Sequence, residues 1–289
     1  MPIRAAAVGH EIGPFPTKLT TRRILAYAAG LGETADVFFD DARDGGIVAP
    51  PMMVIPLEWP MSRDLRETDT FGASDDERRR VVHAGQDTQI FRPLTPGLEL
   101  RIKGRLVSAQ RIKPGTKTVS RLSIEALDGT PFAVSYATAI YRGVDLDGDD
   151  TVEDVPPPWP DLAAAGAWTE TAVPIARDLP HVYTECADIW NPIHTERDFA
   201  LKSGLPDIIL HGTCTLALAV KEVVAGPLGG NPGRLKRFGC RFSGMVIPGG
   251  EITVRHADAR DGPAGGALFE VLDDAGKPAV SDGRALFGD

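Results

Sequence analysis

Residues 183–212 read YTECADIWNPIHTERDFALKSGLPDIILHG, a stretch that contains a turn and the starts of two helices. Pro192 disfavours helical backbone at Asn191 and has no N–H to donate, so we expect a turn there. Asp188 and His194 flank that turn, where a carboxylate and an imidazole aimed at one point can hold and activate a water molecule. Asn191 would orient the water or the carboxylate. An Asx-type turn with a surface histidine explains the same residues, and both interpretations are open.

The stretch continues into HGTCTLALAVKEVVAG, residues 211–226, which is the strongest helix candidate of the C-terminal half. It is apolar nearly all round, which indicates a buried helix. If the helix begins here, the Gly212 N–H lies at its positive end, where unpaired N–H groups stabilise an oxyanion. Glycine also lets a substrate carbonyl approach the backbone. An ordinary helix start, with a structural His211, is the alternative.

Strand-like runs follow this helix at about residues 236–247, 250–260, 266–273 and 278–287, separated by PGG, DGPAGG and DDAGKP turns. One buried helix followed by an antiparallel meander predicts a sheet wrapped around a helix, which is an α+β arrangement.

The N-terminal half repeats these features. PGLELRI at residues 96–102 matches PGGEITV at residues 248–254. Helix-like stretches precede both turns. For the first stretch, residues 19–32, we expect Thr20 as the N-cap and Gly32 as the stop. For the second, residues 194–204, we expect Thr195 as the N-cap and Gly204 as the stop. A duplicated domain is the simplest account.

An acidic and then proline-rich segment, DLDGDDTVEDVPPPWPD at residues 145–161, divides the chain almost in half. Such a composition packs poorly and tends to be extended. We therefore predict an N-terminal domain at 1–144, a linker at 145–168 and a C-terminal domain at 169–289.

The composition excludes several classes of protein. A net charge of −9 and a pI of about 5.2 argue against nonspecific nucleic-acid or anionic-membrane binding. The chain shows no signal-peptide pattern and no run of 18 apolar residues, and its three cysteines form no CxxC pair. We expect a cytoplasmic protein with reduced thiols. The sequence has no metal-ligand cluster, Walker loop or dinucleotide fingerprint, so we expect no cofactor or metal.

The opening stretch resembles the signature of the MaoC-like and hydratase 2 family, which comprises (R)-specific enoyl-CoA hydratases and acyl dehydratases with a hot-dog fold. The matching residues are Tyr183, Asp188, Asn191-Pro192-Ile193-His194, Ala200, Gly204 and Leu210-His211-Gly212. Downstream, RFSGMVIPGGEI resembles the family's strand and Pro-Gly turn. In the first half, HAGQDTQIFRPLTPGLEL and FAVSYATAIYRG resemble the N-terminal repeat of double hot-dog members. The resemblance implies an α+β double hot-dog, with two antiparallel sheets each wrapped around a central helix and fused in one chain.

The resemblance also implies an activity, the reversible hydration of a trans-2-enoyl thioester of coenzyme A or acyl carrier protein to a 3-hydroxyacyl thioester. Asp188, His194, Asn191 and Gly212 would be catalytic, and Tyr183 and His211 would bind substrate. We expect a homodimer. A hot-dog acyl-CoA thioesterase and a non-catalytic acyl-thioester-binding subunit are the alternatives.

The sequence departs from the family pattern at one position. The family places Asp five residues before His, whereas Asp188 lies six before His194, and Ile189 occupies the usual Asp position. Trp190 lies between Ile189 and the Asn-Pro pair. Either the loop bulges by one residue to return Asp188 to the site, or its carboxylate reaches the site from a shifted place. Glu185, which lies further from the proline-fixed turn, is a fallback for the carboxylate.

The first half has no Asn-Pro-x-His. Its matching region, residues 26–42, holds Asp36, Asp40 and Asp41. Prolines in APPMM, residues 49–53, replace the N–H groups of an oxyanion site. We interpret this half as a degenerate copy, which in double hot-dog relatives accommodates the acyl chain.

Positive charge gathers in RLKRFGCRF, residues 234–242. We expect Arg237 and Arg241 to contact the phosphates of coenzyme A. A protective charged strand edge is the alternative.

Overall fold

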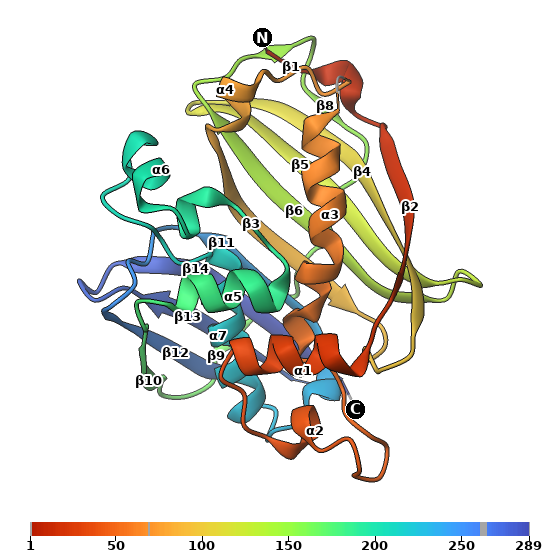
Figure 1. The fold of residues 1–289 in the computed structure, drawn as a ribbon, viewed down its shortest axis with the longest axis vertical. Helices are drawn as coiled ribbons and strands as arrows, with labels where there is room; N and C mark the ends of the chain where they lie inside the picture. Colours follow the sequence, from red (N-terminus) through yellow and green to blue (C-terminus); the bar gives the residue numbers. More distant parts are fainter. Residues whose placement is uncertain (1, 69, 261–264, 289) are drawn as a thin grey trace. The chain divides into compact units, whose positions relative to one another are not determined.

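The computed structural model describes residues 2–68, 70–260 and 265–288 (Figure 1). The chain forms two compact units. The first unit comprises Met1–Lys18, Leu57–Arg92 and Glu99–Pro158, and the second comprises Leu19–Pro56, Pro93–Leu98 and Trp159–Asp289. Residues 19–56, which lie within the predicted N-terminal domain, therefore group with the second unit.

The first unit is an antiparallel sheet with a helix on it. Its strand order is β3 (Val81–Ile90), β6 (Pro131–Arg142), β5 (Gly115–Ala126), β4 (Glu99–Ile112) and β2 (Glu11–Lys18). Helix α3 (Val54–Glu67), which belongs to this unit from Leu57 onward, lies across the sheet (Figure 1). Shorter elements complete the unit: β1 (Ile3–Arg4), η1 (Ala5–Ala7), α4 (Asp75–Arg78), β7 (Leu146–Asp147) and β8 (Thr151–Val152).

The core of this unit follows from alternation along the strands. Buried residues recur at every second position in much of β4, including Leu100, Ile102 and Leu106. The Phe71 and Tyr141 rings lie 5.4 Å apart in one apolar cluster.

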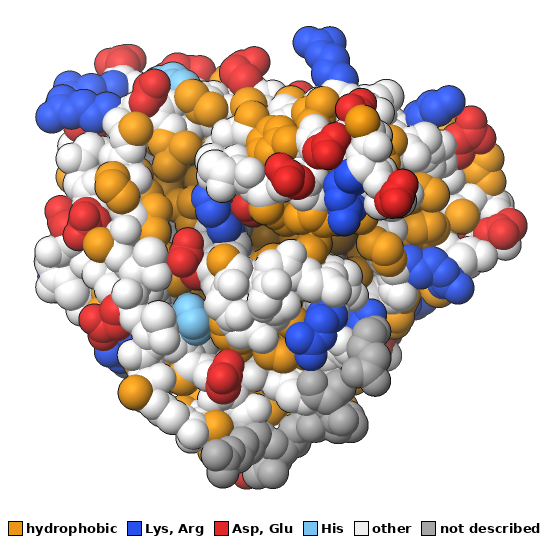
Figure 2. Space-filling model, turned by 90° about the horizontal axis from the view of Figure 1, so that it is seen from below, with side chains coloured by type: hydrophobic (Ala, Val, Ile, Leu, Met, Phe, Trp, Pro, Cys, Tyr) orange, Lys and Arg blue, Asp and Glu red, His pale blue; other side chains and the backbone are white. Residues whose placement is uncertain are grey.

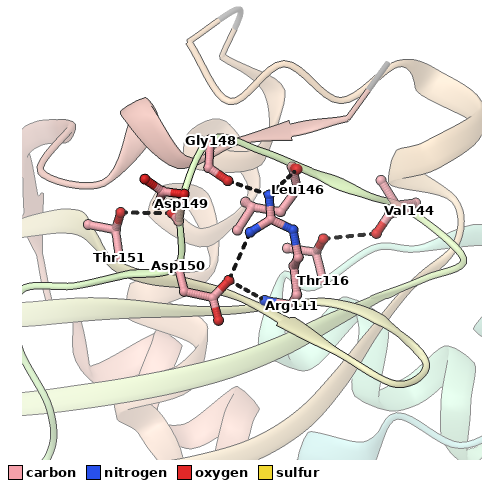
Figure 3. A network of polar contacts seen from close by, with 8 residues as sticks. All are labelled: Arg111, Thr116, Val144, Leu146, Gly148, Asp149, Asp150 and Thr151. Carbon is pink, nitrogen blue, oxygen red and sulfur yellow. Dashed lines mark hydrogen bonds and ion pairs between the residues drawn. The ribbon is translucent and has the colours of Figure 1, made fainter.

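The start of the predicted linker is tied down rather than free (Figure 3). The Arg111 guanidinium donates to the carbonyl of Leu146 at 3.0 Å and to that of Gly148, and it forms an ion pair with Asp150 at 3.2 Å. Strand β8 pairs with β4. The expectation that this acidic segment packs poorly is wrong for residues 146–152, because one arginine pairs both with its carboxylate and with its carbonyls.

The second unit is also an antiparallel sheet wrapped around a helix. Its strand order is β10 (Thr169–Pro174), β12 (Glu251–Arg260), β13 (Gly266–Leu272), β14 (Pro278–Phe287) and β11 (Leu235–Phe242). Helix α7 (Gly212–Ala225) packs on β11 to β14 and is buried nearly all round. The remaining elements are α1 (Thr21–Gly30), α2 (Asp36–Phe39), η2 (Pro51–Met53), β9 (Ala163–Ala164), α5 (Leu179–Ala187), η3 (Pro192–His194), α6 (Arg197–Lys202) and η4 (Pro232–Arg234).

The predicted α+β meander is confirmed, with one strand shorter than expected. Strand β11 ends at Phe242 rather than residue 247, because the N–H groups of Ser243 and Gly244 both bond the carbonyl of Ala279 and end the regular ladder. Residues 261–264 of the predicted DGPAGG turn lie outside the described residues.

Of the two predicted N-caps, Thr20 is confirmed and Thr195 is wrong. Thr20 caps α1 by accepting from the Arg23 N–H at 3.2 Å, as predicted. The prediction of Thr195 as the second cap is wrong, because His194 and Thr195 first complete the 3₁₀ turn η3. Helix α6 then begins at Arg197 with Glu196 as its N-cap.

Helices α1 and α5 pack closely at a glycine. A Cβ built on Gly30 would lie only 2.6 Å from the Cβ of Cys186. Because Gly30 has no Cβ, α5 can rest directly on α1, which fixes the end of α5 and the turn that follows it.

Candidate active site

The turn after α5 is built as the Asn-Pro pair predicts. Asn191 has extended backbone, its side-chain oxygen accepts from the Ile193 N–H at 3.4 Å, and Pro192 opens η3. Asn191 therefore caps the turn that presents His194. In this arrangement its amide oxygen acts on the backbone rather than on a free ligand site.

His194 is buried, and one of its two ring nitrogens is hydrogen-bonded to the backbone. Its Nδ1 lies 2.8 Å from the carbonyl oxygen of Ile209, and because a carbonyl only accepts, Nδ1 carries the proton. Burial lowers the pKa of His194 to about 4, and the bond to Ile209 only partly opposes this shift. At neutral pH the ring is uncharged, and its Nε2 lone pair is the basic site.

His211 stacks directly on His194. The ring centroids are 3.7 Å apart and the planes are inclined by 24°. Burial, and then the neighbouring His194, lower the pKa of His211 to about 2. Its Nε2 lies 3.3 Å from both the Ile189 carbonyl and the Thr184 hydroxyl, and its buried Nδ1 has no partner among the described residues. His211 thus joins the start of α7 to the end of α5.

Helix α7 begins with two N–H groups for which the described part of the chain supplies no acceptor. His211 is its N-cap without a side-chain cap, and the N–H groups of Cys214 and Thr215 both bond the His211 carbonyl. Among the described residues, the N–H groups of Gly212 and Thr213 have no acceptor. They lie at the positive end of a 14-residue helix, beside the His194–His211 stack. This is an anion-stabilising position next to a base.

Gly212 is also required by close packing. A Cβ at this residue would lie 3.1 Å from Cδ1 of Phe242. Glycine therefore leaves the helix start open where a larger residue would crowd the strand.

Asp188 ends α5 in the left-handed conformation, with φ 57° and ψ 40°. Non-glycine residues adopt this conformation rarely, although Asp tolerates it better than most. The Asp188 side chain is exposed, and no hydrogen bond or ion pair joins it to His194 in the described part of the chain. The structure therefore brings His194 and Gly212 together but does not pair Asp188 with His194.

The turn accommodates its extra residue because two successive side chains point in opposite directions. Ile189 points into the core, with only 4% of its surface exposed, while Trp190 is exposed and donates to Glu196 at 3.2 Å. Ile189 thus occupies a core position, not that of a catalytic carboxylate. Glu185, the alternative carboxylate, is exposed on α5.

Arg23 is a residue that the sequence reasoning missed. It lies on α1, which packs against α5, and its Nη2 donates to the Pro56 carbonyl at 3.1 Å. That carbonyl needs a partner because Pro60, four residues later in α3, has no N–H. Burial lowers the pKa of Arg23, and the charge of Asp188 acts in the opposite direction. Arg23 thus lies within electrostatic range of Asp188, and no local motif reveals a pairing so distant in sequence.

Tyr183 is fully buried behind the site. Its hydroxyl donates to Thr213 at 3.2 Å, and its ring lies 5.0 Å from that of His211. Burial raises its pKa. The residue braces α5 against the first turn of α7.

The two arginines expected at the phosphates differ in exposure. Arg237 is buried, with its guanidinium 4.0 Å from the Trp159 ring centroid, whereas Arg241 is exposed beside Asp282 at 3.4 Å. On the face shown in Figure 2, positive and negative side chains are interspersed.

The described residues contain no group of three or more His, Cys, Asp or Glu placed to hold a metal ion. None of the helices in the same residues is long and apolar enough to cross a membrane.

The chain is similar to known proteins along most of its length. Residues 167–262 match the MaoC-like domain model, and residues 6–126 match the FAS1-like dehydratase domain region. The chain is 26% identical over 257 residues to enoyl-CoA hydratase ChsH3 of Mycobacterium tuberculosis, covering 86% of each protein.

Solved structures confirm the predicted fold. A MaoC-like dehydratase from Phytophthora capsici superposes with a TM-score of 0.83 at 21% identity, covering 99% of this chain and 97% of that one. A Mycobacterium tuberculosis protein described as having a double hot-dog fold gives a TM-score of 0.64 at 15% identity, covering 97% and 96%. The chain therefore has the double hot-dog fold.

Proposed function

Residues 167–262 form a MaoC-like domain and residues 6–126 a FAS1-like dehydratase region, and from that premise we propose that the chain is a hydro-lyase. It reversibly hydrates a trans-2-enoyl thioester, of coenzyme A or acyl carrier protein, to the 3-hydroxyacyl thioester. One observation carries the proposal: the neutral His194, with a basic Nε2, stacks on the residue that precedes the two unpaired N–H groups of α7.

Each group has a role in the addition of water. The thioester carbonyl accepts from the N–H groups of Gly212 and Thr213, which stabilise the negative charge that develops on its oxygen. Nε2 of His194 takes a proton from the water as its oxygen bonds the β-carbon, and that proton is then delivered to the α-carbon. Asp188 holds the water from the other side. Dehydration runs through the same steps in reverse.

The supporting residues fix this geometry. His211 and Tyr183 join the end of α5 to the start of α7, so they position the catalytic groups from behind. Arg241, exposed on β11, remains our proposed contact for a coenzyme A phosphate. Arg237 is buried against Trp159, so it supports the strand.

The test follows the enoyl-thioester absorbance band with crotonyl-CoA and longer or branched 2-enoyl-CoAs. We expect wild-type protein to remove the band and His194→Ala to lower turnover at least about 10²-fold, the low end for a general acid/base. His10→Ala, which removes a histidine from the first unit, is the control. Near-normal turnover in folded His194→Ala contradicts the assignment.

The carboxylate is tested separately with Asp188→Asn and Glu185→Gln. We expect only the Asp188 change to lower turnover. If only the Glu185 change does so, the proposed carboxylate is wrong.

Thiol release measured in the same samples tests the thioesterase alternative. Burial raises the pKa of the thiols of Cys214 and Cys186, which disfavours a thiolate nucleophile.

A further inference from the structure

The first turn of α7 carries a hydroxyl group that the reaction as proposed above does not use. Thr213 is the second residue of the helix and is half-buried, whereas the next two residues, Cys214 and Thr215, are buried. The Oγ1 atom of Thr213 accepts a hydrogen bond from the hydroxyl of Tyr183 at 3.2 Å. Burial raises the pKa of Tyr183, so its hydroxyl keeps the proton that it donates.

The hydrogen of the Thr213 hydroxyl has no acceptor among the described residues. A hydroxyl carries one hydrogen and two lone pairs, and because Tyr183 donates to a lone pair, the hydrogen points elsewhere. A threonine within a helix often donates to the carbonyl four residues earlier, as Thr215 does at 3.3 Å. For Thr213 that carbonyl belongs to Ile209, which accepts instead from Nδ1 of His194 at 2.8 Å. The Thr213 hydrogen is therefore available to a ligand.

Tyr183 also fixes the orientation of this hydroxyl. A threonine in a helix divides between two side-chain rotamers, and a hydrogen bond to its Oγ1 selects one of them. Tyr183 is itself fully buried, and its ring lies 5.0 Å from that of His211, the N-cap of α7. A donor that is held in place before the substrate binds stabilises developing charge without having to reorganise. Thr213 thus offers two donors, its N–H and its hydroxyl, at the turn where Gly212 offers one.

We propose that the Thr213 hydroxyl donates a hydrogen bond to the thioester carbonyl oxygen of the substrate, as a third donor beside the N–H groups of Gly212 and Thr213. The inference rests on the proposed function, because it adds a donor to the oxyanion site of that reaction. A carbonyl oxygen has two lone pairs, which the two N–H groups can occupy, and the enolate oxygen that forms as water adds has a third. The Thr213 hydroxyl therefore acts on the charged intermediate more than on the bound substrate.

The kinetic test compares Thr213→Val, which keeps the shape of the side chain and its N–H group, with Thr213→Ser, which keeps the hydroxyl. With the best 2-enoyl-CoA of the previous test, we expect Thr213→Val to lower kcat about 10²-fold and to change KM less than about threefold. Thr213→Ser should recover most of the lost kcat. Thr215→Val is the matched control on the same helix, because the Thr215 hydroxyl already donates to a backbone carbonyl. It should keep the wild-type kcat.

A second pair of variants separates the hydroxyl from packing. Thr213→Val leaves the buried Tyr183 hydroxyl without its acceptor, and such a group destabilises the helix start by itself. The double variant, Tyr183→Phe with Thr213→Val, removes both hydroxyl groups, and circular dichroism checks that it folds. We expect it to turn over at least about tenfold more slowly than Tyr183→Phe alone. Equal turnover of the two would assign the loss in Thr213→Val to packing and overturn the inference.

Binding of acetoacetyl-CoA needs no turnover and reports the charge on the same oxygen. This thioester ionises to an enolate that has its own ultraviolet absorbance, and an oxyanion site raises the ratio of enolate to neutral ligand in the bound state. We expect that ratio to fall about tenfold from wild type to Thr213→Val, the scale of one hydrogen bond to a charged group.

The enolate measurement also distinguishes the two proposals. If wild type hydrates no enoyl-CoA yet ionises bound acetoacetyl-CoA in a Thr213-dependent manner, the proposed function fails and this inference stands. If the enolate ratio is the same in wild type and Thr213→Val, the inference fails irrespective of turnover, and solvent water is the acceptor of the Thr213 hydroxyl.

Discussion

At the scale of single residues, the proposed chemistry depends on N–H groups that a substitution can remove one at a time. Gly212 is the first helical residue of α7, where proline is well tolerated because its missing N–H is not used by the helix. The preceding His211 has φ −56° and ψ 130°, an extended conformation that proline accepts in its neighbour.

We therefore expect Gly212→Pro to lower kcat about 10²–10³-fold, the usual loss when one oxyanion donor is removed. Gly212→Ala is the control, because it adds the same Cβ near Phe242 and keeps the N–H. Steady-state kinetics on both variants separates crowding from hydrogen bonding. Equal losses in the two variants would assign the effect to crowding and remove Gly212 from the oxyanion site.

The ionisation of His194 gives a second expectation at this scale. Only its neutral form takes a proton, and its pKa is lowered to about 4, so activity is lost as pH falls through that value. We expect kcat/KM to stay level from about pH 8 to pH 5 and to halve near pH 4, since this parameter reports the free enzyme. The same pH profile of kcat/KM is measured for Asp188→Asn, to show which group causes the loss of activity at acid pH. If kcat/KM is instead halved near pH 6.5 in both wild type and Asp188→Asn, water reaches the imidazole ring of His194 and its pKa is not lowered.

At the scale of helices and strands, the site depends on how closely α5 approaches α1. Replacing Gly30 by Ala should raise helix propensity, by roughly 0.5–1 kcal/mol in an exposed helix. In this structure the new Cβ lies 2.6 Å from the Cβ of Cys186, so we expect a net loss of about 1–3 kcal/mol in the free energy of unfolding.

Urea unfolding of Gly30→Ala, Cys186→Gly and the double variant measures this coupling. The double variant should recover much of the loss, because removing one Cβ makes room for the other. Turnover should follow, since α5 carries Tyr183 and ends at Asp188. Additive losses in the cycle would mean that the helices adjust without strain.

Local patterns predicted the elements well and the partners of the site poorly. The helix α7 and the strands β12 to β14 follow from periodicity and turn residues, and His194 and Gly212 follow from one continuous stretch. Arg23 has no such signal, because the carbonyl that it contacts is distant in sequence. The prediction of Thr195 as an N-cap failed for a different reason. Threonine is a common N-cap residue, but the 3₁₀ turn that begins at Pro192 includes His194 and ends at Thr195.

At the scale of the whole chain, buried histidines and buried carboxyl groups change stability with pH in opposite directions. Together they should give a pH at which the free energy of unfolding is greatest. Burial lowers the pKa of four histidines from 6.5, to about 4 for His83 and His194 and to about 2 for His211, and it acts in the same direction on His256. Below pH 6.5 the unfolded chain therefore binds protons that the folded chain does not, and stability falls with acidification. Burial also raises the pKa of Glu33 to about 6 and that of Glu58 from 4.5 to about 8.

The carboxyl groups act in the opposite sense. Between pH 4.5 and 8 the folded chain keeps the Glu58 proton that the unfolded chain has released, so this residue lowers stability as pH rises. The four histidines outweigh the two carboxyls on the acid side, and of these six groups Glu58 is the one that acts above pH 6.5. We expect the free energy of unfolding in urea to peak near pH 6.5 and to fall by about 1–2 kcal/mol toward pH 8. Glu58→Gln should abolish the decrease in the free energy of unfolding above pH 6.5 and keep the decrease below it. If the alkaline fall persists in Glu58→Gln, another group carries it, and Glu58 is not the neutral acid that its burial requires.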